Sequence, residues 1–187
     1  MKICMIGAGY VGLVSGACFS SFGHTVYCVD NDESKIEKLK RGKTPIYEPR
    51  LQSLLKQNIK QKRLFFDTKI DKVLPISDVI FIAVDTPSKE GRGEANLSNL
   101  FSIIEQVKPI IKSSQVVVLK STVPIGTNEK VDSMLNYKKG KEKIPVVSNP
   151  EFLREGSAIE DFTKPDRVVL GLSSELAKSV MSDIYKP

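Results

Sequence analysis

The feature that most restricts the fold of this sequence is an alternation of short apolar runs with segments of helical periodicity. The run at 78–84, DVIFIAV, is almost wholly apolar, as is typical of a parallel strand buried on both faces. The segment at 99–112 instead places its apolar residues on one helical face. Strands alternating with helices predict an α/β fold: a doubly wound, mostly parallel Rossmann-type sheet with helices on both faces.

The same patterns place the individual elements along the chain. We expect strands at 2–7, 25–30, 63–67, 78–84, 115–121, 144–150 and 167–171. We expect helices at 10–23, 33–42, 49–60, 99–112, 126–135 and 173–185. Gly23 and Gly42 suit the left-handed position after a helix, and Pro109 should kink or stop the helix before it. The polar loop at 88–98 is expected to be the most flexible region.

The stretch GAGYVG at 7–12 lies between the first strand and the first helix, where dinucleotide-binding folds hold a pyrophosphate. Gly7 would permit the tight turn, Gly9 would leave room for the pyrophosphate, and Gly12 would let the helix pack closely. The amides of Tyr10, Val11 and Gly12 would face the phosphates, whose charge the helix dipole favours. The alternative is a strand–turn–helix with no ligand.

An acidic residue, Asp30, lies at the end of the second expected strand. A carboxylate there would accept hydrogen bonds from the adenosine ribose and repel a 2′-phosphate, which favours NAD over NADP. Without a ligand, Asp30 would only cap the next helix. Lys35 could reach back to the same ribose, or it could be an exposed lysine on that helix.

The net charge of +6 and two lysine-rich stretches, 56–63 and 138–143, raise the question of nucleic-acid binding. We favour a solvated surface, because acidic residues are mixed in and aromatic residues are not interleaved. We therefore expect no nucleic-acid partner, and a mild positive field that suits an anionic small molecule. No apolar run is long enough to cross a membrane. Three cysteines without CxxC spacing predict a reducing cytoplasm, no disulfides and no metal site.

Two further stretches lie at the predicted carboxyl ends of strands, where ligands bind in such folds. STVPIGT at 121–127 could present hydroxyls to a ligand, or Thr127 or Asn128 could simply cap the next helix. Glu151 and Glu155 would share one face if their segment is helical, which would suit acid–base work. The alternative there is the solvated start of a helix.

Six stretches, in this order, resemble the UDP-glucose 6-dehydrogenases of the UDP-glucose/GDP-mannose dehydrogenase family: GAGYVGLVSG, YEPRL, AVDTPS, KSTVPIGT, NPEFLREGSAIEDF and PDRVVLG. The resemblance covers essentially the whole chain. It implies oxidation of UDP-glucose to UDP-glucuronate with two NAD, in nucleotide-sugar metabolism and polysaccharide biosynthesis. A GDP-mannose or other nucleotide-sugar dehydrogenase is the alternative, although PDRVVLG fits the UDP-glucose branch better. Arg50 stands where the family more often has glycine, which leaves that loop's conformation open.

The resemblance also assigns roles to matching residues. Thr86 and Thr122 are similar to NAD contacts of the family, and Thr122 and Glu155 are expected to be catalytic. Glu155 would lie near both the nicotinamide and the reacting carbon, in acid–base or water-positioning work. Arg167 would lie near the interface with the rest of the enzyme. The implied substrate contacts are consecutive: Glu151, Phe152, Leu153, Arg154 and Glu155.

The resemblance further implies a cysteine nucleophile in a glycine-rich motif beyond residue 187, with a catalytic lysine, asparagine and aspartate. Cys4, Cys18 and Cys28 lie in elements expected to be buried, which makes them unreactive, and His24 is expected to be structural.

Residues 1–187 therefore correspond to the NAD-binding Rossmann domain, the N-terminal part of a longer enzyme without its central helix and C-terminal substrate domain. We expect this chain to bind NAD without turnover. The full enzyme would be a homodimer held by the central helix, and the chain alone a monomer. The alternative is a non-catalytic NAD-binding module, and the Glu155 motif argues against this alternative.

Overall fold

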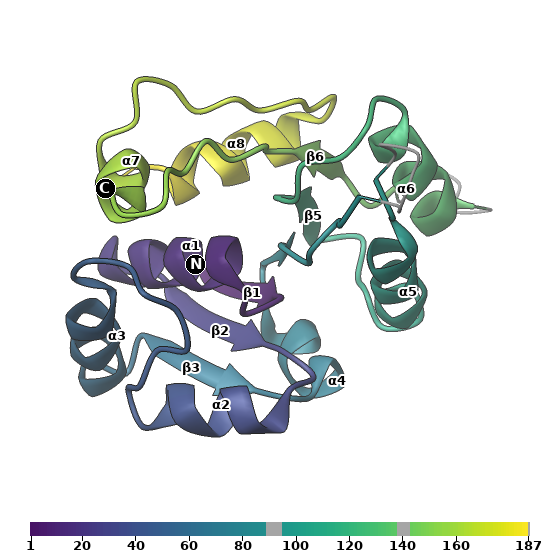
Figure 1. Ribbon diagram of the computed structural model, residues 1–187. Helices are drawn as coiled ribbons and strands as arrows, with labels where there is room; N and C mark the ends of the chain where they lie inside the picture. The colour runs from purple at the N-terminus through teal and green to yellow at the C-terminus, as the bar shows by residue number, and fades with distance from the viewer. Residues whose placement is uncertain (89–94, 138–142, 187) are drawn as a thin grey trace.

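The computed structural model describes residues 1–88, 95–137 and 143–186, and within these residues six strands form a single parallel sheet (Figure 1). Their order across the sheet is β3-β2-β1-β4-β5-β6. Their bounds are Lys2–Ile6 (β1), Thr25–Val29 (β2), Leu64–Asp67 (β3), Val79–Ile82 (β4), Val116–Leu119 (β5) and Val146–Ser148 (β6). Because the order reverses beside β1, a crevice opens at the carboxyl ends of β1 and β4. The predicted doubly wound α/β fold is confirmed.

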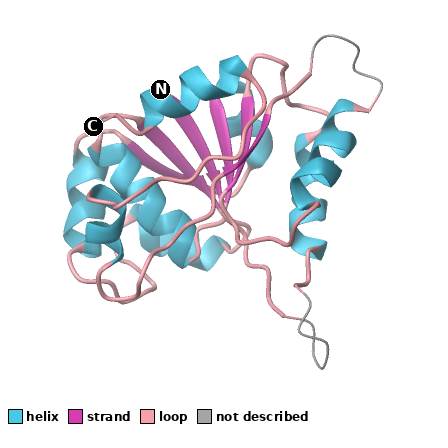
Figure 2. Ribbon diagram, turned by 90° about the horizontal axis from the view of Figure 1, so that it is seen from above, coloured by secondary structure: helices cyan, strands magenta, loops and turns pink. Residues whose placement is uncertain are grey.

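Helices cover both faces of this sheet, as Figure 2 shows from above. One face carries α1 (Tyr10–Ser21), α2 (Glu33–Lys40), α3 (Leu51–Lys60), α7 (Ala158–Thr163) and α8 (Glu175–Ile184). The other face carries α4 (Ile70–Val73), the short 3₁₀ turn Leu74–Ile76, α5 (Ser98–Val107) and α6 (Thr127–Asn136). In the part of the chain described, no helix is long and apolar enough to span a bilayer.

The alternation of side chains along each strand supplies a separate core to each face. On β1, Ile3 and Met5 pack toward α1, whereas Cys4 and Ile6 pack toward the face of α5 and α6. All four side chains are buried, which explains why the strands read as continuous apolar runs rather than as alternating ones. The parallel register of β1 with both β2 and β4 brings the ends of these three strands to one edge.

The expected strand at 167–171 is not formed, and this prediction is wrong. The stretch is extended, but its pairing is a single antiparallel bridge between Ser148 and Gly171, with both hydrogen bonds at 2.8 Å. Val168 and Val169 are 39% and 40% exposed. Their β-branched side chains are typical of a strand. However, β6 forms a ladder only with β5, and residues 167–171 meet the opposite edge of β6 at a single bridge.

Several helix ends lie where the sequence predicts them, whereas two short elements were not predicted. The helix before Pro109 ends at Val107, as expected, and Gly23 and Gly42 take the left-handed conformation with φ of 97° and 69°. The short helix α4 and the 3₁₀ turn were not predicted, because four and three residues show no periodicity. Most of the loop at 88–98 and of the lysine-rich stretch at 138–143 lies outside the described residues.

Candidate functional site

The stretch from the turn after β1 into the first turn of α1 requires glycine at two of its three glycine positions. Gly7 has φ of 101°, and a Cβ on it would lie 2.5 Å from the carbonyl oxygen of Ala83 at the end of β4. A Cβ on Gly12 would lie 1.9 Å from the carbonyl oxygen of Gly7. Neither position can hold a side chain, because real Cβ atoms do not approach backbone so closely. The expected roles of Gly7 in the turn and Gly12 in close packing are confirmed.

Gly9 differs from the other two glycines because the protein itself does not require it. Its φ of −75° suits any residue, and the one heavy atom near an added Cβ is a carboxylate oxygen of Asp85 at 3.5 Å. Open space therefore lies above the Gly9 backbone. The first helical hydrogen bond of α1 runs from the Leu13 amide to the Gly9 carbonyl at 2.9 Å, so the amides before Leu13 lack intrahelical acceptors. A bare backbone beside free amides is the geometry that accepts a phosphate.

Asp30 lies just beyond β2 and is bound to the glycine turn. Its Oδ2 accepts hydrogen bonds from the Ala8 amide and from Lys35 Nζ, both at 2.9 Å, and its Oδ1 accepts one from the Asp32 amide at 3.0 Å. Burial alone would raise the pKa of Asp30, but these three donors outweigh it and lower the pKa. The group is therefore a carboxylate at neutral pH.

Asp30 is not the helix cap that the alternative interpretation supposed. The cap of α2 is Asp32, whose Oδ1 accepts from the Lys35 amide at 2.9 Å. The Asp30 carboxylate therefore contacts the glycine turn and lines the cleft. Lys35 is not a free surface lysine, because its side chain is only 27% exposed and its Nζ is paired with Asp30.

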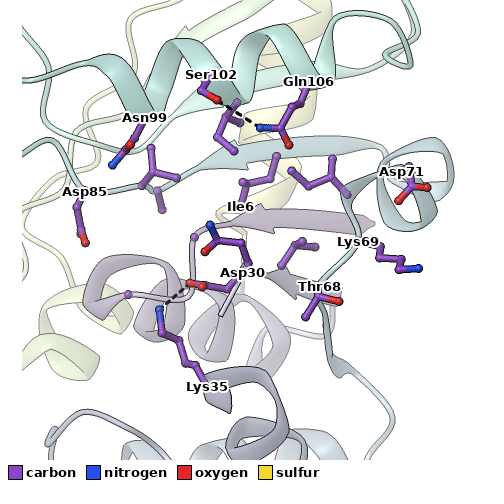
Figure 3. A pocket seen from close by; sticks show the side chains of 18 of the residues that line it. Ile6, Asp30, Lys35, Thr68, Lys69, Asp71, Asp85, Asn99, Ser102 and Gln106 are labelled. Atoms are coloured by element: carbon purple, nitrogen blue, oxygen red, sulfur yellow. Dashed lines mark hydrogen bonds and ion pairs between the residues drawn. The ribbon is translucent and has the colours of Figure 1, made fainter. Parts of the chain in front are cut away.

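A cleft of about 730 Å³ opens in front of these residues, at the carboxyl ends of β1, β2 and β4 (Figure 3). Gly7, Gly9, Asp30 and Lys35 line it on one side, and residues of α5 line the other. Its volume lies within the usual range of cofactor sites. Sequence reasoning missed most of the polar side chains that line it, because these residues lie in loops, in α4 and in α5 without a motif of their own: Asn31, Thr68, Lys69, Asp71, Asn99, Ser102 and Gln106.

The two threonines expected to contact the coenzyme lie together, outside this cleft. Thr86 follows β4 and Thr122 follows β5, and the Thr86 hydroxyl donates to the Thr122 carbonyl at 3.0 Å. The neighbouring hydroxyl of Ser121 is buried and donates to the Val84 carbonyl at 2.6 Å, so it is not available to a ligand. Of the STVPIGT hydroxyls, the exposed Thr122 is the one that faces solvent.

Neither proposed side-chain cap of α6 is formed, which corrects that alternative. The residue at the cap position is Gly126, with φ of 86°, and α6 has no side-chain cap hydrogen bond. Thr127 instead donates its hydroxyl back to the Pro124 carbonyl at 2.7 Å. The turn after β5 is therefore held by two hydrogen bonds to the Pro124 carbonyl, one from the Thr127 hydroxyl and one from the Thr127 amide at 3.2 Å.

The condition under which Glu151 and Glu155 would share a helical face is not met. Residues 151–154 are irregular, 155–157 form a turn, and α7 begins only at Ala158. The Glu151 carboxylate accepts from the Leu153 amide at 2.6 Å, so it caps a local turn, and Gly156 with φ of 91° breaks the chain direction. Glu155 is exposed near Tyr10, since its charge contributes to raising the pKa of that phenol.

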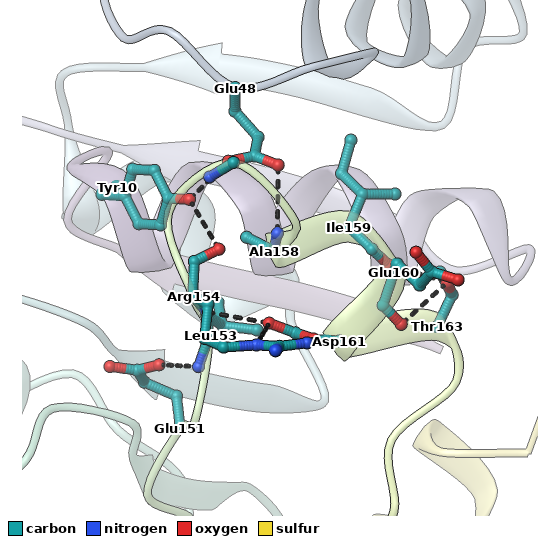
Figure 4. Close-up of polar contacts among 11 residues, drawn as sticks. Tyr10, Glu48, Glu151, Leu153, Arg154, Ala158, Ile159, Glu160, Asp161 and Thr163 are labelled. Carbon is teal, nitrogen blue, oxygen red and sulfur yellow. Dashed lines mark hydrogen bonds and ion pairs between the residues drawn. The ribbon is translucent and has the colours of Figure 1, made fainter.

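The rest of the expected substrate segment is arranged around a salt bridge, seen in Figure 4. Arg154 Nη2 lies 2.7 Å from Asp161 Oδ1, and the Arg154 amide donates to Asp161 Oδ2 at 2.9 Å. The Phe152 side chain is 64% exposed, whereas Leu153 packs against the core. A second cleft of about 750 Å³ is lined by Glu151–Arg154 together with 160–162 and 164–169, including Arg167.

Two features of this second region were missed from the sequence. Glu48, in the loop before α3, is 5% exposed and accepts hydrogen bonds from the amides of Gly156 and Ala158. Lys120 is 4% exposed, and its Nζ lies 3.2 Å from Asn149 Oδ1 and 3.3 Å from the Tyr185 hydroxyl. Burial lowers the pKa of Lys120 to about 8, opposed by the charge of Glu151. Because each contact joins residues far apart in the chain, no local signal could have revealed it.

The three cysteines and the histidine are structural, as expected. Burial raises the pKa of the Cys18 and Cys28 thiols to about 12 and that of Cys4 further still, so none is a thiolate at neutral pH. His24 Nε2 hydrogen-bonds the Ile184 carbonyl at 2.9 Å. Among the residues that the structure covers, no group of histidines, cysteines and acids could hold a metal ion.

Comparison with known proteins agrees with this geometry. Residues 1–187 match the family described as "UDP-glucose/GDP-mannose dehydrogenase family, NAD binding domain". The UDP-glucose 6-dehydrogenase of Rhizobium meliloti (strain 1021) is 50% identical over 189 aligned residues, which cover all of this chain and 43% of that protein. The chain thus spans less than half the length of this curated relative.

Solved structures show the same fold. A UDP-glucose dehydrogenase from the hyperthermophilic archaeon Pyrobaculum islandicum is 40% identical, with a TM-score of 0.91 over 98% of this chain and 43% of that one. A GDP-mannose dehydrogenase from Pseudomonas aeruginosa, solved as a ternary complex, is 36% identical, with a TM-score of 0.93 over 99% of this chain and 44% of that one. The sheet and helices described above are therefore those of nucleotide-sugar dehydrogenases.

Proposed function

Because the chain belongs to the UDP-glucose/GDP-mannose dehydrogenase family as an NAD-binding domain, we propose that it is the coenzyme-binding half of a UDP-glucose 6-dehydrogenase. The full enzyme would oxidise UDP-glucose to UDP-glucuronate with two NAD. The observation that carries the proposal is the open backbone at Gly9 next to the carboxylate of Asp30, in one cleft.

The residues present fit NAD. The free amides at the start of α1 would receive the diphosphate, and the space above Gly9 would admit it. Asp30, ionised and held by Ala8 and Lys35, would accept from the adenosine ribose hydroxyls and repel a 2′-phosphate. When bound, NAD supplies a hydride acceptor at its nicotinamide ring. Thr86 and Thr122, at the ends of β4 and β5, would orient that half of the coenzyme.

Glu155 would act where coenzyme and sugar meet. It is exposed in the turn before α7 and follows Arg154, whose carbonyl lies 3.5 Å from the hydroxyl of Tyr10 at the start of α1, and this proximity supports the role. There it would hold a water or take a proton in the late hydrolysis step, and Thr122 would assist. The segment from Glu151 to Arg154, along the second cleft, would contact the nucleotide sugar.

This chain by itself would bind NAD without turnover. All three of its thiols are buried and protonated, whereas the two-step oxidation that the resemblance implies needs an exposed, activated thiol. Unpaired cysteines also support a reducing compartment such as the cytoplasm, and we propose that the full enzyme is a homodimer and this chain a monomer.

Isothermal titration of the chain with NAD, and an NADH assay with UDP-glucose, test the proposal. We expect saturable binding of NAD, weaker binding of NADP, and no NADH. Absence of NAD binding would refute the coenzyme role, and NADH production by the chain alone would refute its dependence on further residues.

A GDP-mannose dehydrogenase is the second candidate, because that structure superposes with a TM-score of 0.93. The 50% identity to a UDP-glucose 6-dehydrogenase, against 36% to the GDP-mannose enzyme, favours UDP-glucose. A panel of sugar nucleotides, tested on a protein that contains this chain together with the remainder found in its relatives, separates the two. A preference for GDP-mannose in that panel would overturn the choice of substrate.

A further inference from the structure

The buried carboxylate of Glu48 connects parts of the chain that are far apart in sequence (Figure 4). Its Oε2 accepts from the Tyr10 hydroxyl at 2.5 Å and from the Gly156 amide at 2.8 Å. Its Oε1 accepts from the Ala158 amide at 3.0 Å. Both oxygens are therefore used, and the three donors come from the start of α1, the turn before α7 and the first residue of α7.

Tyr10 joins the glycine turn to Glu48. It is the first residue of α1 and follows Gly9 directly, so its backbone amide belongs to the proposed phosphate-binding group. Its side chain reaches Glu48, and its hydroxyl also lies 3.5 Å from the Arg154 carbonyl. Burial, and then the hydrogen bond and charge of Glu48, raise the pKa of Tyr10 well above its usual value. The phenol thus stays protonated and continues to donate.

The turn at 154–158 depends on Glu48 for its shape. The Ala158 amide is buried and Gly156 is in the left-handed conformation, so the turn holds an uncommon backbone path. Without the carboxylate, two amides that it now satisfies would lose their acceptor. The exposed side chain carried between these anchored amides is that of Glu155.

We propose that Tyr10 and Glu48 are positioning residues that couple the coenzyme turn to the segment carrying Glu155. A diphosphate held by the amides of α1 restrains Tyr10, Tyr10 restrains the Glu48 carboxylate, and Glu48 restrains the 154–158 turn. Because coupling between two sites is reciprocal, a fixed 154–158 turn also favours coenzyme binding. The inference rests on the proposed function in one respect, that NAD binds at the glycine turn.

Amide hydrogen exchange of the chain with and without saturating NAD tests the coupling. In the unsubstituted chain we expect NAD to slow exchange of the Gly156 and Ala158 amides several-fold. Tyr10→Phe keeps the ring but removes the donor. In this variant the ratio of the exchange rates without and with NAD should fall to near one. A purely structural contact would protect these amides equally with and without NAD, so the ligand dependence separates the two roles.

Tyr27→Phe is the matched control, because Tyr27 is stacked on Phe65 on β2 and β3 and contacts neither cleft. We expect it to leave the NAD-dependent protection unchanged. If Tyr10→Phe retains the full slowing of Gly156 and Ala158 at saturating NAD, the coupling is refuted. If NAD does not bind the unsubstituted chain, the proposed function fails instead, and the two failures are distinguishable.

A double-mutant cycle on NAD affinity gives a second test that does not rely on exchange. We expect Tyr10→Phe and Glu48→Gln each to weaken NAD binding by about threefold to tenfold. The double variant should be no weaker than the worse single variant, because both changes break one chain of contacts. Additive losses would show that the two residues act separately and would overturn the proposal. Glu37→Gln, on the exposed face of α2, controls for loss of a carboxylate.

Discussion

The Asp30 carboxylate accepts a hydrogen bond from the Ala8 amide at 2.9 Å, so the end of β2 is fastened to the glycine turn after β1. The residue proposed to bind the ribose therefore also shapes the loop proposed to bind the phosphates. A substitution at Asp30 is consequently expected to affect both stability and coenzyme selection, and each effect needs its own control.

We expect Asp30→Ala to weaken NAD binding by ten- to a hundredfold and to narrow the preference for NAD over NADP. The cause is loss of the ribose acceptor and of the charge that repels a 2′-phosphate. The lost hydrogen bonds should also lower the free energy of unfolding by about 2 kcal/mol. Titration calorimetry with both coenzymes, together with urea unfolding, measures the two effects.

Asp32→Ala is the control for this prediction, since Asp32 caps α2 but does not line the cleft. It should cost about 1 kcal/mol of stability through the lost cap and leave the NAD-to-NADP ratio unchanged. An Asp30→Ala chain that keeps the full ratio would contradict the assigned role.

Gly9→Ala and Gly12→Ala should have opposite consequences. A Cβ on Gly9 meets its nearest atom at 3.5 Å, so the variant should fold with little change in melting temperature but bind NAD at least tenfold more weakly. A Cβ on Gly12 would lie 1.9 Å from the Gly7 carbonyl oxygen, which should cost about 3 kcal/mol or more. Thermal unfolding and calorimetry of both variants check this. Normal NAD affinity in Gly9→Ala would show that no phosphate approaches there.

Asp85→Asn should strengthen NAD binding severalfold. The Asp85 carboxylate lines the cleft and lies closest to the open side of Gly9, so its charge would repel a bound diphosphate. The amide keeps the shape and removes the charge. Calorimetry at low and high salt tests this, because the gain should shrink as salt screens the charge. Weaker binding would instead show that Asp85 contacts a coenzyme hydroxyl.

Lys120→Met should remove part of the pH dependence of stability. Burial lowers the pKa of Lys120 to about 8 in the folded chain, against 10.5 as its ordinary value. Between these values the unfolded chain binds more protons, so stability rises with pH. From pH 7 to 9.5 the titration of Lys120 should raise the free energy of unfolding by about 2 kcal/mol. Tyr185 keeps its proton throughout this pH range. Urea unfolding at several pH values measures the slope.

The exposed Lys178 provides the control for that experiment, because its side chain is 65% exposed. Lys178→Met should retain the rise in stability with pH, and Lys120→Met should lose it. Equal slopes in both variants would mean that Lys120 stays charged at its site beside Asn149 and Tyr185.

Much of the coenzyme site follows from local sequence. Gly7 and Gly12 could be assigned because a turn and a close helix leave no room for a Cβ, whatever the rest of the fold. Asp30 could be placed because it directly follows a strand of the sheet, and parallel strands end at the same edge. Whether Glu151 and Glu155 share a face could not be decided from the sequence, because a spacing of four gives one face only if the segment is helical. Gly156 and the Glu151 turn prevent that helix.

The amino-acid sequence by itself determined the alternating strands and helices, the glycine turn and the acid at the end of β2, because each depends on backbone sterics or a repeat of a few residues. Tertiary structure alone decided that Glu48 would hold the turn before α7 and that Lys120 would be buried beside Tyr185. Those contacts join residues separated by 65 and 108 positions, and no local preference encodes a meeting that the packing of the whole sheet brings about.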